Sequence, residues 1–267
     1  MAKVYFNNVS FKRGNRTFNF YNTSIEVPDD AIPGADCPEI SRTLSWQGYY
    51  EAISLDTNMD LEYHEGEEEK MVVFGPENWI NNLDFFVEYG CLKIQPREAN
   101  KSGCFASRPK LIIHHQGLKE LRGTCSGDMT LYGKTALESL VLTSSDTVRF
   151  VDGIESANLC IQIKGSTEVT IQQGRIRHLH IDILGSGKVT ATNLLCLGAE
   201  INLVGSGQVS LAGETDRLTA VLTGSGKILC GDFKASTGSV TTTGGLVECK
   251  VDHLGRVSNI NGTIINH

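Results

Sequence analysis

Three segments near the middle of the chain can be written one above the other: IDILGSGKVTA (residues 181–191), INLVGSGQVSL (residues 201–211) and AVLTGSGKILC (residues 220–230). Each has a Gly-Ser-Gly turn at its centre, and apolar residues alternate with mostly polar ones on both sides. Alternation with a period of two, rich in β-branched residues, is typical of strands with one buried face. Each segment therefore predicts two strands joined by a short turn.

The turn recurs at nearly constant spacing. Counted from the central residue, successive turns are 19, 21, 20, 20, 19 and 19 residues apart. One Ser-Gly pair is a weak signal, but seven turns at this spacing indicate an internal repeat. The turns are Cys125-Ser126-Gly127, Ser144-Ser145-Asp146, Gly165-Ser166-Thr167, Gly185-Ser186-Gly187, Gly205-Ser206-Gly207, Gly224-Ser225-Gly226 and Thr243-Gly244-Gly245.

Stacking is what allows such a unit to bury its apolar face. Each strand then pairs with its equivalent one coil later, and apolar columns fill the axis. A β-propeller would need about 40 residues per blade, and a leucine-rich repeat would have its own leucine signature. We therefore predict an all-β protein, a right-handed parallel β-helix (solenoid) with coils of about 20 residues. The expected columns include Val169, Val189 and Val209, and Ile163, Ile183 and Leu203.

These apolar columns cannot stabilise the chain by themselves. Burying an apolar side chain contributes about 2 kcal/mol, and ordering each residue costs at least about 1 kcal/mol. A further buried side and covers at both ends must therefore contribute.

Composition and charge exclude several classes of partner. The chain has 28 glycines but only 6 prolines, which favours many tight turns. The net charge of −7 argues against a nucleic-acid partner, because phosphate contacts need clustered Lys and Arg. No apolar run approaches the roughly 18 residues of a membrane span. Because no signal peptide is visible, we expect a cytoplasmic protein, or an exported or cell-surface one if a signal has been removed.

Eight cysteines are present, none in a CxxC pair. A chain of this length needs no disulfide staples, and several cysteines fall on inward positions of the repeat. We expect all eight to be free, including Cys230 in the column of Ile171 and Leu211.

The chain divides into three segments by pattern. Residues 1–50 carry aromatic-rich strands, such as Val4 to Phe6 and Phe18 to Phe20, that form a cap or hairpin. Residues 51–250 form the β-helix, with irregular early strands, a short helical connection near Asn78 to Leu83, and regular coils from about residue 116. Residues 251–267 form a C-terminal cap.

Part of this sequence resembles a known family. The run ISLDTNMDLEYHEGEEE (residues 53–69), followed by PENWIN (residues 76–81) and GCLKIQ (residues 90–95), looks like the autotransporter adhesin head GIN domain. The stacked small-residue turns are similar too, and the match covers about 51–250. The resemblance implies a β-helix, usually exported or at the cell surface, with no established activity and no catalytic residues to carry over.

Two histidine pairs and one acidic loop are the candidate metal ligands. His178 and His180 face outward on one strand, but zinc needs a third ligand that the pattern does not place. His114 and His115 point to opposite faces and cannot chelate together. The acidic loop Glu65 to Glu69 lacks the spaced oxygens of a calcium site. We therefore expect no bound metal and no cofactor.

The serine column and the outward acids offer no catalytic constellation either. No His or Asp repeats beside the serines, so we interpret them as turn residues. Hydrolysis of a glycan requires carboxylates that converge on one face. Here the outward acids are scattered. The residues considered are Ser126, Ser145, Ser166, Ser186, Ser206 and Ser225, and Asp128, Glu168, Asp182 and Glu200.

These observations favour a non-catalytic structural or binding module that presents a β-helix surface to a protein or glycan. The alternative is a carbohydrate-active β-helix enzyme of the polysaccharide lyase or hydrolase type. A groove with two carboxylates on neighbouring coils, plus an Arg or Lys, would discriminate in favour of the enzyme. A third hypothesis is a scaffold that forms end-to-end or side-by-side homo-oligomers.

Overall fold

A computed structural model describes residues 39–44, 49–97, 108–124, 127–143 and 147–267, together with the backbone of strands β1 to β4. β1 (Ala2–Phe6) pairs with β4 (Thr23–Val27), and β2 (Val9–Arg13) pairs with β3 (Arg16–Phe20), both antiparallel. The strands expected near Val4 and Phe18 are therefore present. The roles of residues 1–50 and 251–267 as separate caps stay predictions.

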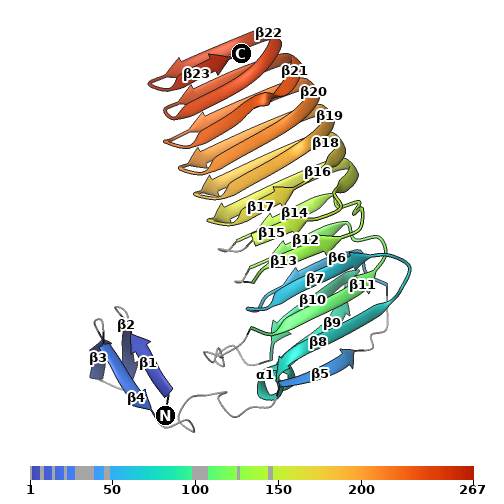
Figure 1. Cartoon of the computed structure of the whole chain (residues 1–267), viewed down its shortest axis with the longest axis vertical. Coiled ribbons are helices and arrows are strands. Elements are labelled where there is room, and N and C mark those ends of the chain that lie inside the picture. The colour runs from blue at the N-terminus through green and yellow to red at the C-terminus, as the bar shows by residue number, and fades with distance from the viewer. Residues whose placement is uncertain are drawn as a thin grey trace.

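From β5 onward the strands stack into one long column of coils (Figure 1). The prediction of a parallel β-helix with coils of about 20 residues is confirmed. In the regular part every strand pair is parallel. Its strands are β12 (Glu120–Gly123), β13 (Met129–Tyr132), β14 (Ser139–Leu142), β15 (Thr147–Phe150), β16 (Ile154–Gly165), β17 (Glu168–Ile171), β18 (Gly174–Gly185), β19 (Lys188–Gly205), β20 (Gln208–Thr223), β21 (Lys227–Thr243), β22 (Leu246–Ile260) and β23 (Thr263–Asn266).

The apolar columns lie inside, as expected from the alternation. Val189 is in register with Val169 on one side and Val209 on the other, and all three are fully buried. Ile183 lies in the same way between Ile163 and Leu203. Because these side chains are buried on consecutive coils, they form one continuous core along the axis of the column.

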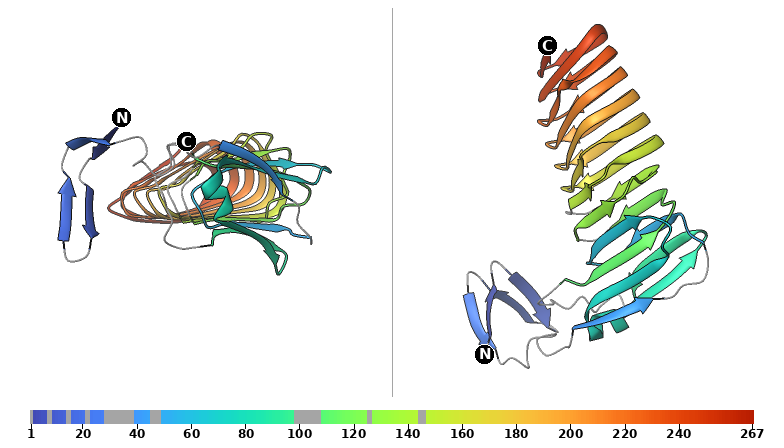
Figure 2. Two further views of the ribbon diagram at one scale, coloured as in Figure 1. Left: turned by 90° about the horizontal axis from the view of Figure 1, so that it is seen from below. Right: turned by 45° about the vertical axis from the view of Figure 1, so that its right-hand side comes forward.

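Each coil also has a short third side. Consecutive exposed residues, such as Arg177 and His178 in β18, mark a bend, and the coils are seen as closed outlines in end view (Figure 2). Before the bend, one inward column consists of Ile154, Gly174, Leu194, Gly213 and Phe233. Leu194 Cδ2 lies only 2.8 Å from the place a Cβ of Gly174 would occupy. A large side chain thus fills the space that the neighbouring glycine leaves, and this column supplies the further buried side.

The turns between the two long sides require glycine. Gly205 has φ 130°, and a Cβ there would lie 2.2 Å from the carbonyl oxygen of Gly185 one coil below. Only a residue without a side chain fits this conformation and this approach. The Gly-Ser-Gly repeat is therefore a consequence of how tightly the coils stack.

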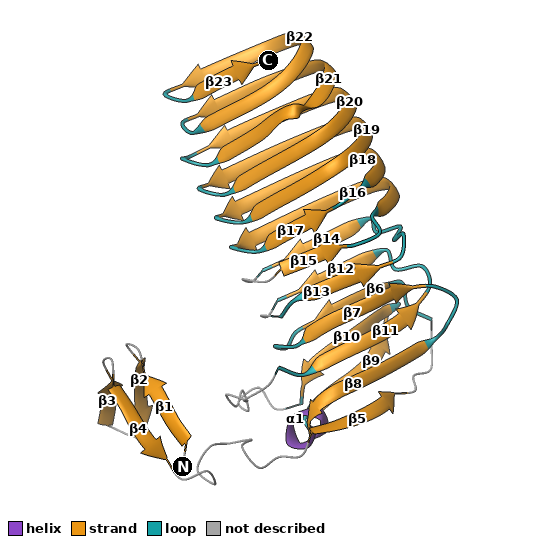
Figure 3. Cartoon of the chain, viewed as in Figure 1, coloured by secondary structure: helices purple, strands orange, loops and turns teal. Residues whose placement is uncertain are grey.

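The N-terminal part of the column is interleaved. β6 lies between β10 and β12, and β7 contacts β11 and β13 in parallel, so later strands insert beneath earlier ones. Antiparallel strands and one short helix complete this end (Figure 3). The elements are β5 (Glu39–Leu44), β6 (Ala52–Leu55), β7 (Asp60–Glu65), β8 (Lys70–Pro76), α1 (Glu77–Asn81), β9 (Leu83–Glu88), β10 (Cys91–Pro96) and β11 (Lys110–His115). Within the described residues, no helix has the length and apolar character to cross a bilayer.

The cysteines that the structure describes are unpaired. Cys91 and Cys160 are partly exposed, and Cys196, Cys230 and Cys249 are buried, all with free thiols. The prediction of free cysteines is confirmed for these five; Cys37, Cys104 and Cys125 lie outside the described residues. Cys230 and Cys249 follow Leu211 in the same inward column, which continues the core toward the C-terminal end.

Candidate functional site

The acidic loop and the histidine pair near it have structural partners. The Oε2 of Glu65 accepts a hydrogen bond from Tyr63 at 2.9 Å, and its Oε1 accepts one from the Gly117 amide at 2.7 Å. His115 is buried and bonded to Glu69, whereas His114 faces outward and stacks on His64 with ring centroids 4.5 Å apart. The two neighbouring histidines thus point to opposite faces, as expected. No group of His, Cys, Asp or Glu in the described part of the chain has metal-site geometry.

The serine column lies on exposed turns. Ser186 and Ser206 donate backbone hydrogen bonds to Gly165 and Gly185 of the coil below, at 2.9 and 3.0 Å. Ser166 and Ser225 occupy equivalent exposed positions, and Ser126 and Ser145 lie outside the described residues. Their backbone bonding is that of turn residues.

His178 and His180 lie on an outward wall formed by β18 to β21. His180 lies between two acids: its Nε2 is 2.8 Å from Asp182 and its Nδ1 is 3.5 Å from Glu200 on the next coil. His178, two residues earlier, is exposed. The structure therefore places His180 between a carboxylate of its own strand and one from the next coil.

A groove of about 520 Å³ opens in this wall. Its centre is Gly198, which is in register with His178 on one coil and with Arg217 on the next. Thr237 follows Arg217 in the same outward column. The groove thus lies where one coil lacks a side chain between an imidazole and a guanidinium. The other lining residues are Leu179, His180, Leu197, Ala199, Glu200, Asp216 and Thr219.

Gly198 is not needed for the fold in the way that the turn glycines are. Its φ is not positive, and a Cβ added there would meet only His178 Nδ1, at an ordinary contact distance of 3.5 Å. Glycine in the interior of a strand weakens the strand, and it often marks a place where a ligand approaches closely. The missing side chain therefore singles out this gap as the candidate site.

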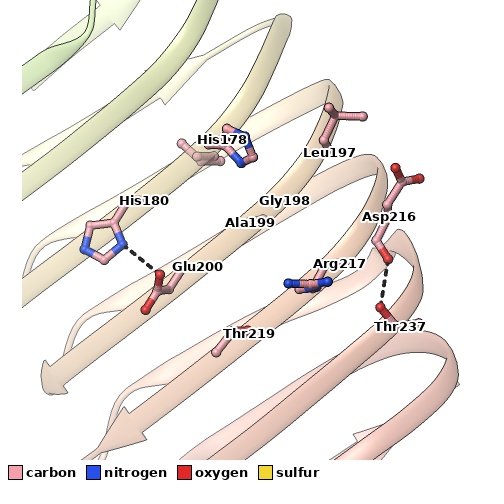
Figure 4. Close-up of a pocket in the computed structure, with 11 residues that line it drawn as sticks. His178, His180, Leu197, Gly198, Ala199, Glu200, Asp216, Arg217, Thr219 and Thr237 are labelled. Atoms are coloured by element: carbon pink, nitrogen blue, oxygen red, sulfur yellow. Dashed lines mark hydrogen bonds and ion pairs between the residues drawn. The ribbon is translucent and has the colours of Figure 1, made fainter.

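The charged groups around the gap differ in how they are compensated. Among the described residues, the guanidinium of Arg217 forms no ion pair or hydrogen bond, and it lines the groove (Figure 4). Glu200 turns toward His180, and the backbone carbonyl of Asp216 accepts a bond from Thr237 at 3.2 Å. At the bend, Leu197 adds an apolar flank with 51% of its surface exposed. The groove thus offers one free cation, several acceptors and one apolar edge.

The sequence pattern does not bring these residues together. It places His178, His180, Asp182 and Glu200 on outward positions, and it does not single out Gly198 or Arg217. An alignment of the coils by their turns could have indicated the site, because Gly198 interrupts a column of outward side chains. That column reads Asn158, His178, Gly198, Arg217 and Thr237.

Comparisons with known proteins agree with this architecture. A family model described as "Putative auto-transporter adhesin, head GIN domain" matches residues 49–230. A solved structure from Parabacteroides distasonis, described as a "putative lipid binding protein", has a TM-score of 0.61 at 20% identity, covering 86% of this chain and 96% of that chain.

Two solved structures described as putative adhesins are also similar. The one from Parabacteroides merdae has a TM-score of 0.58 at 14% identity, covering 88% of this chain and 98% of that one. The one from Parabacteroides distasonis has a TM-score of 0.56 at 16% identity, covering 86% and 97%. At these identities the likeness shows the fold. No curated protein matches the sequence.

Proposed function

The chain belongs to the auto-transporter adhesin head GIN domain family, and on that premise we propose that it is a non-catalytic module that binds a glycan through the Gly198 groove. The matched residues 49–230 include Gly198, Glu200 and Arg217. The adhesin name of the family suggests a role in binding. The observation that carries the proposal is the gap at Gly198, a mid-strand glycine for which neither backbone conformation nor steric crowding gives a reason.

The chemistry of the lining suits a saccharide. A sugar presents hydroxyl groups that donate and accept hydrogen bonds, and C–H faces that are apolar. Glu200 and Thr219 supply acceptors, His178 supplies a ring nitrogen, and Leu197 supplies apolar surface. An open wall also suits a long chain of sugars, because the coils on either side of the groove continue the same surface.

A carbohydrate-active enzyme is the second candidate, and one observation favours it. Glu200 and Asp216 lie on neighbouring coils and line one groove with Arg217, which is the arrangement that would be expected of such an enzyme. In Figure 4, however, the Asp216 carboxylate lies at the bend, beyond Arg217 as seen from Glu200. The Glu200 side chain is also 62% exposed. Catalysis needs groups held around one reacting atom, so we favour binding without cleavage.

We also propose that the protein acts outside the cytoplasm. The family is named for auto-transporter adhesins, which favours the exported or cell-surface alternative over the cytoplasmic one. Of the described free thiols, Cys196, Cys230 and Cys249 are buried away from oxidants, and Cys91 and Cys160 are partly exposed. Immunofluorescence on intact cells would show surface labelling if this proposal is right and none if it is wrong.

A glycan array with the purified chain tests the binding proposal. We expect the unmodified chain to bind at least one glycan class, and Gly198→Trp, which fills the gap, to abolish that binding. Gly255→Trp is the matched control, because Gly255 is also a strand glycine with open space, its nearest atom being 3.6 Å away. No bound glycan on the array, or equal binding by Gly198→Trp, would refute the proposal. Circular dichroism checks that both variants fold.

A further inference from the structure

We propose that the sugar bound at the Gly198 groove carries a carboxylate, and that Arg217 binds it. This inference rests on the proposed function and narrows it to one class of ligand: acidic saccharides, such as those that contain uronic or sialic acids. It is carried by the position of Arg217 beside the gap and by the charges that surround it.

In the described part of the chain, the guanidinium of Arg217 has no counter-ion, although it lies beside the gap at Gly198. Acids are close on the same wall. Some exposed cations of the coils are paired, as Lys188 is with Glu168 at 2.9 Å and Lys234 is with Asp252 at 3.9 Å, and Arg217 is not. The acids Asp182 and Glu200 are instead oriented toward His180. The Asp216 carboxylate lies at the bend, whereas the guanidinium of Arg217 is in register with Gly198, so a ligand seated over Gly198 meets a cation without a counter-ion, and its complement there is an anion.

The gap at Gly198 is wide enough for one sugar ring, and it opens beside the Arg217 guanidinium. Neighbouring coils are about 4.8 Å apart, so His178 and Arg217 stand two spacings, about 10 Å, apart on either side of Gly198. One sugar ring fits between them with its face over the glycine backbone. A carboxylate on that ring then meets the planar guanidinium, whose two parallel N–H groups match two carboxylate oxygens.

The other lining groups match the remainder of a sugar acid. Glu200 and Thr219 lie on the neighbouring outward column and can accept hydrogen bonds from ring hydroxyls. Thr237, next to Arg217, already donates its hydroxyl to Asp216, so its oxygen is left as an acceptor. A neutral sugar would satisfy these groups but would cover Arg217 without supplying an anion. Covering a charged donor without a partner is costly, so a neutral analogue should bind more weakly.

Matched pairs of ligands test the inference by isothermal titration calorimetry. Trigalacturonate and its methyl ester share rings and ring hydroxyls but differ in charge, and sialyllactose and lactose form a second pair. We expect at least one acid to bind tenfold or more tightly than its neutral partner, with affinity that falls as NaCl is added. Arg217→Met should reduce the affinity for the acid to that for the neutral partner, and Arg217→Lys should retain part of it.

The control is Lys227→Met, which removes the same charge from an exposed position outside the groove. It should leave both affinities unchanged. Three outcomes would overturn the inference but leave the proposed function intact. The acid and its neutral partner could bind with equal affinity, the array could show only neutral glycans, or Arg217→Met could bind the acid as tightly as the parent does. If no glycan binds on the array or by calorimetry, the proposed function itself fails.

Discussion

His115 and Glu69 are joined inside the N-terminal coils by a hydrogen bond of 2.9 Å between the imidazole Nδ1 and the carboxylate Oε1. The other ring nitrogen, Nε2, lies 2.9 Å from the backbone carbonyl oxygen of Tyr50. Both partners are acceptors, because neither a carboxylate nor a carbonyl oxygen has a hydrogen to donate. His115 is only 3% exposed, and both of its ring nitrogens lie within hydrogen-bond distance of an oxygen atom.

Replacing this residue should destabilise the N-terminal coils. His115→Phe keeps a ring to stack on Tyr50, whose centroid is 4.1 Å away, but removes both nitrogens. Hydrogen bonds to charged groups contribute about 1.5–3 kcal/mol, so we expect the free energy of unfolding to fall by about 2 kcal/mol in urea titrations. His253→Phe, at an exposed position, is the control and should change little. An unchanged free energy of unfolding in His115→Phe would contradict a stabilising role for these two contacts.

The core columns should not tolerate charge. Val189 is fully buried between Val169 and Val209, so Val189→Asp would place an unpaired carboxylate in the axis of the column. Such burial costs several kcal/mol, and we expect the variant to unfold or aggregate. Thr190→Asp, one residue later and facing outward, should fold with a circular dichroism spectrum like that of the parent. A folded Val189→Asp would contradict the packing of this column.

Constant coil length explains why these columns could be predicted from sequence alone. A strand alternates with period two, so equal spacing places Val169, Val189 and Val209 on top of one another. A further buried side was expected, but its residues could not be identified, because large and absent side chains alternate in its column, as at Gly174 and Leu194. No run of similar residues marks such a side.

The arrangement of the N-terminal coils and the Gly198 groove could not be predicted from sequence for other reasons. β10 lies beneath β6 although it follows it in sequence, because antiparallel β8 and β9 return the chain to that end. Residues from three successive coils surround Gly198, so they come together only when the coils are aligned. Gly198 is singled out by its φ and by the open space around it, and neither can be read from the sequence.

Buried cysteines should make stability fall at alkaline pH. Burial raises the pKa of Cys230 to about 12, whereas an unfolded cysteine has a pKa of about 8.5. The folded state then holds the proton after the unfolded state has lost it. This contribution is fully present below about pH 8.5 and is lost as pH rises toward 12. In urea titrations, Cys230→Ala should flatten the decline in the free energy of unfolding between these pH values.

The half-exposed Cys91 provides the comparison, and Cys91→Ala should flatten the decline less. An equal effect of both substitutions would contradict the assignment to Cys230. After denaturation all eight thiols should react with a thiol reagent, and a count of two or fewer would indicate disulfides.

Gly198 and Gly205, which both lie in β19, should respond in opposite ways to the same substitution. Gly205→Val places a side chain at φ 130° and against the Gly185 oxygen, so it should destabilise or unfold the chain. Gly198→Val meets no close contact and replaces a poor strand former, so it should raise the free energy of unfolding by about 0.5–1 kcal/mol. Thermal unfolding followed by circular dichroism measures both. A destabilised Gly198→Val would mean that the fold requires this glycine, and would remove the main support for a ligand site.

The final prediction is that the groove binds without cleaving. Glu200 and Asp216 lie on the two sides of Arg217 in Figure 4, and Glu200 is 62% exposed to water. Acid–base catalysis on a glycosidic bond needs a pair of carboxylates that flank that bond, and elimination from a uronic acid needs a base placed at one ring proton. We expect no release of reducing sugars and no ultraviolet-absorbing unsaturated product from polygalacturonate or alginate. Cleavage by the purified chain that disappears in Glu200→Gln, while binding by that variant persists, would show that the groove is an active site.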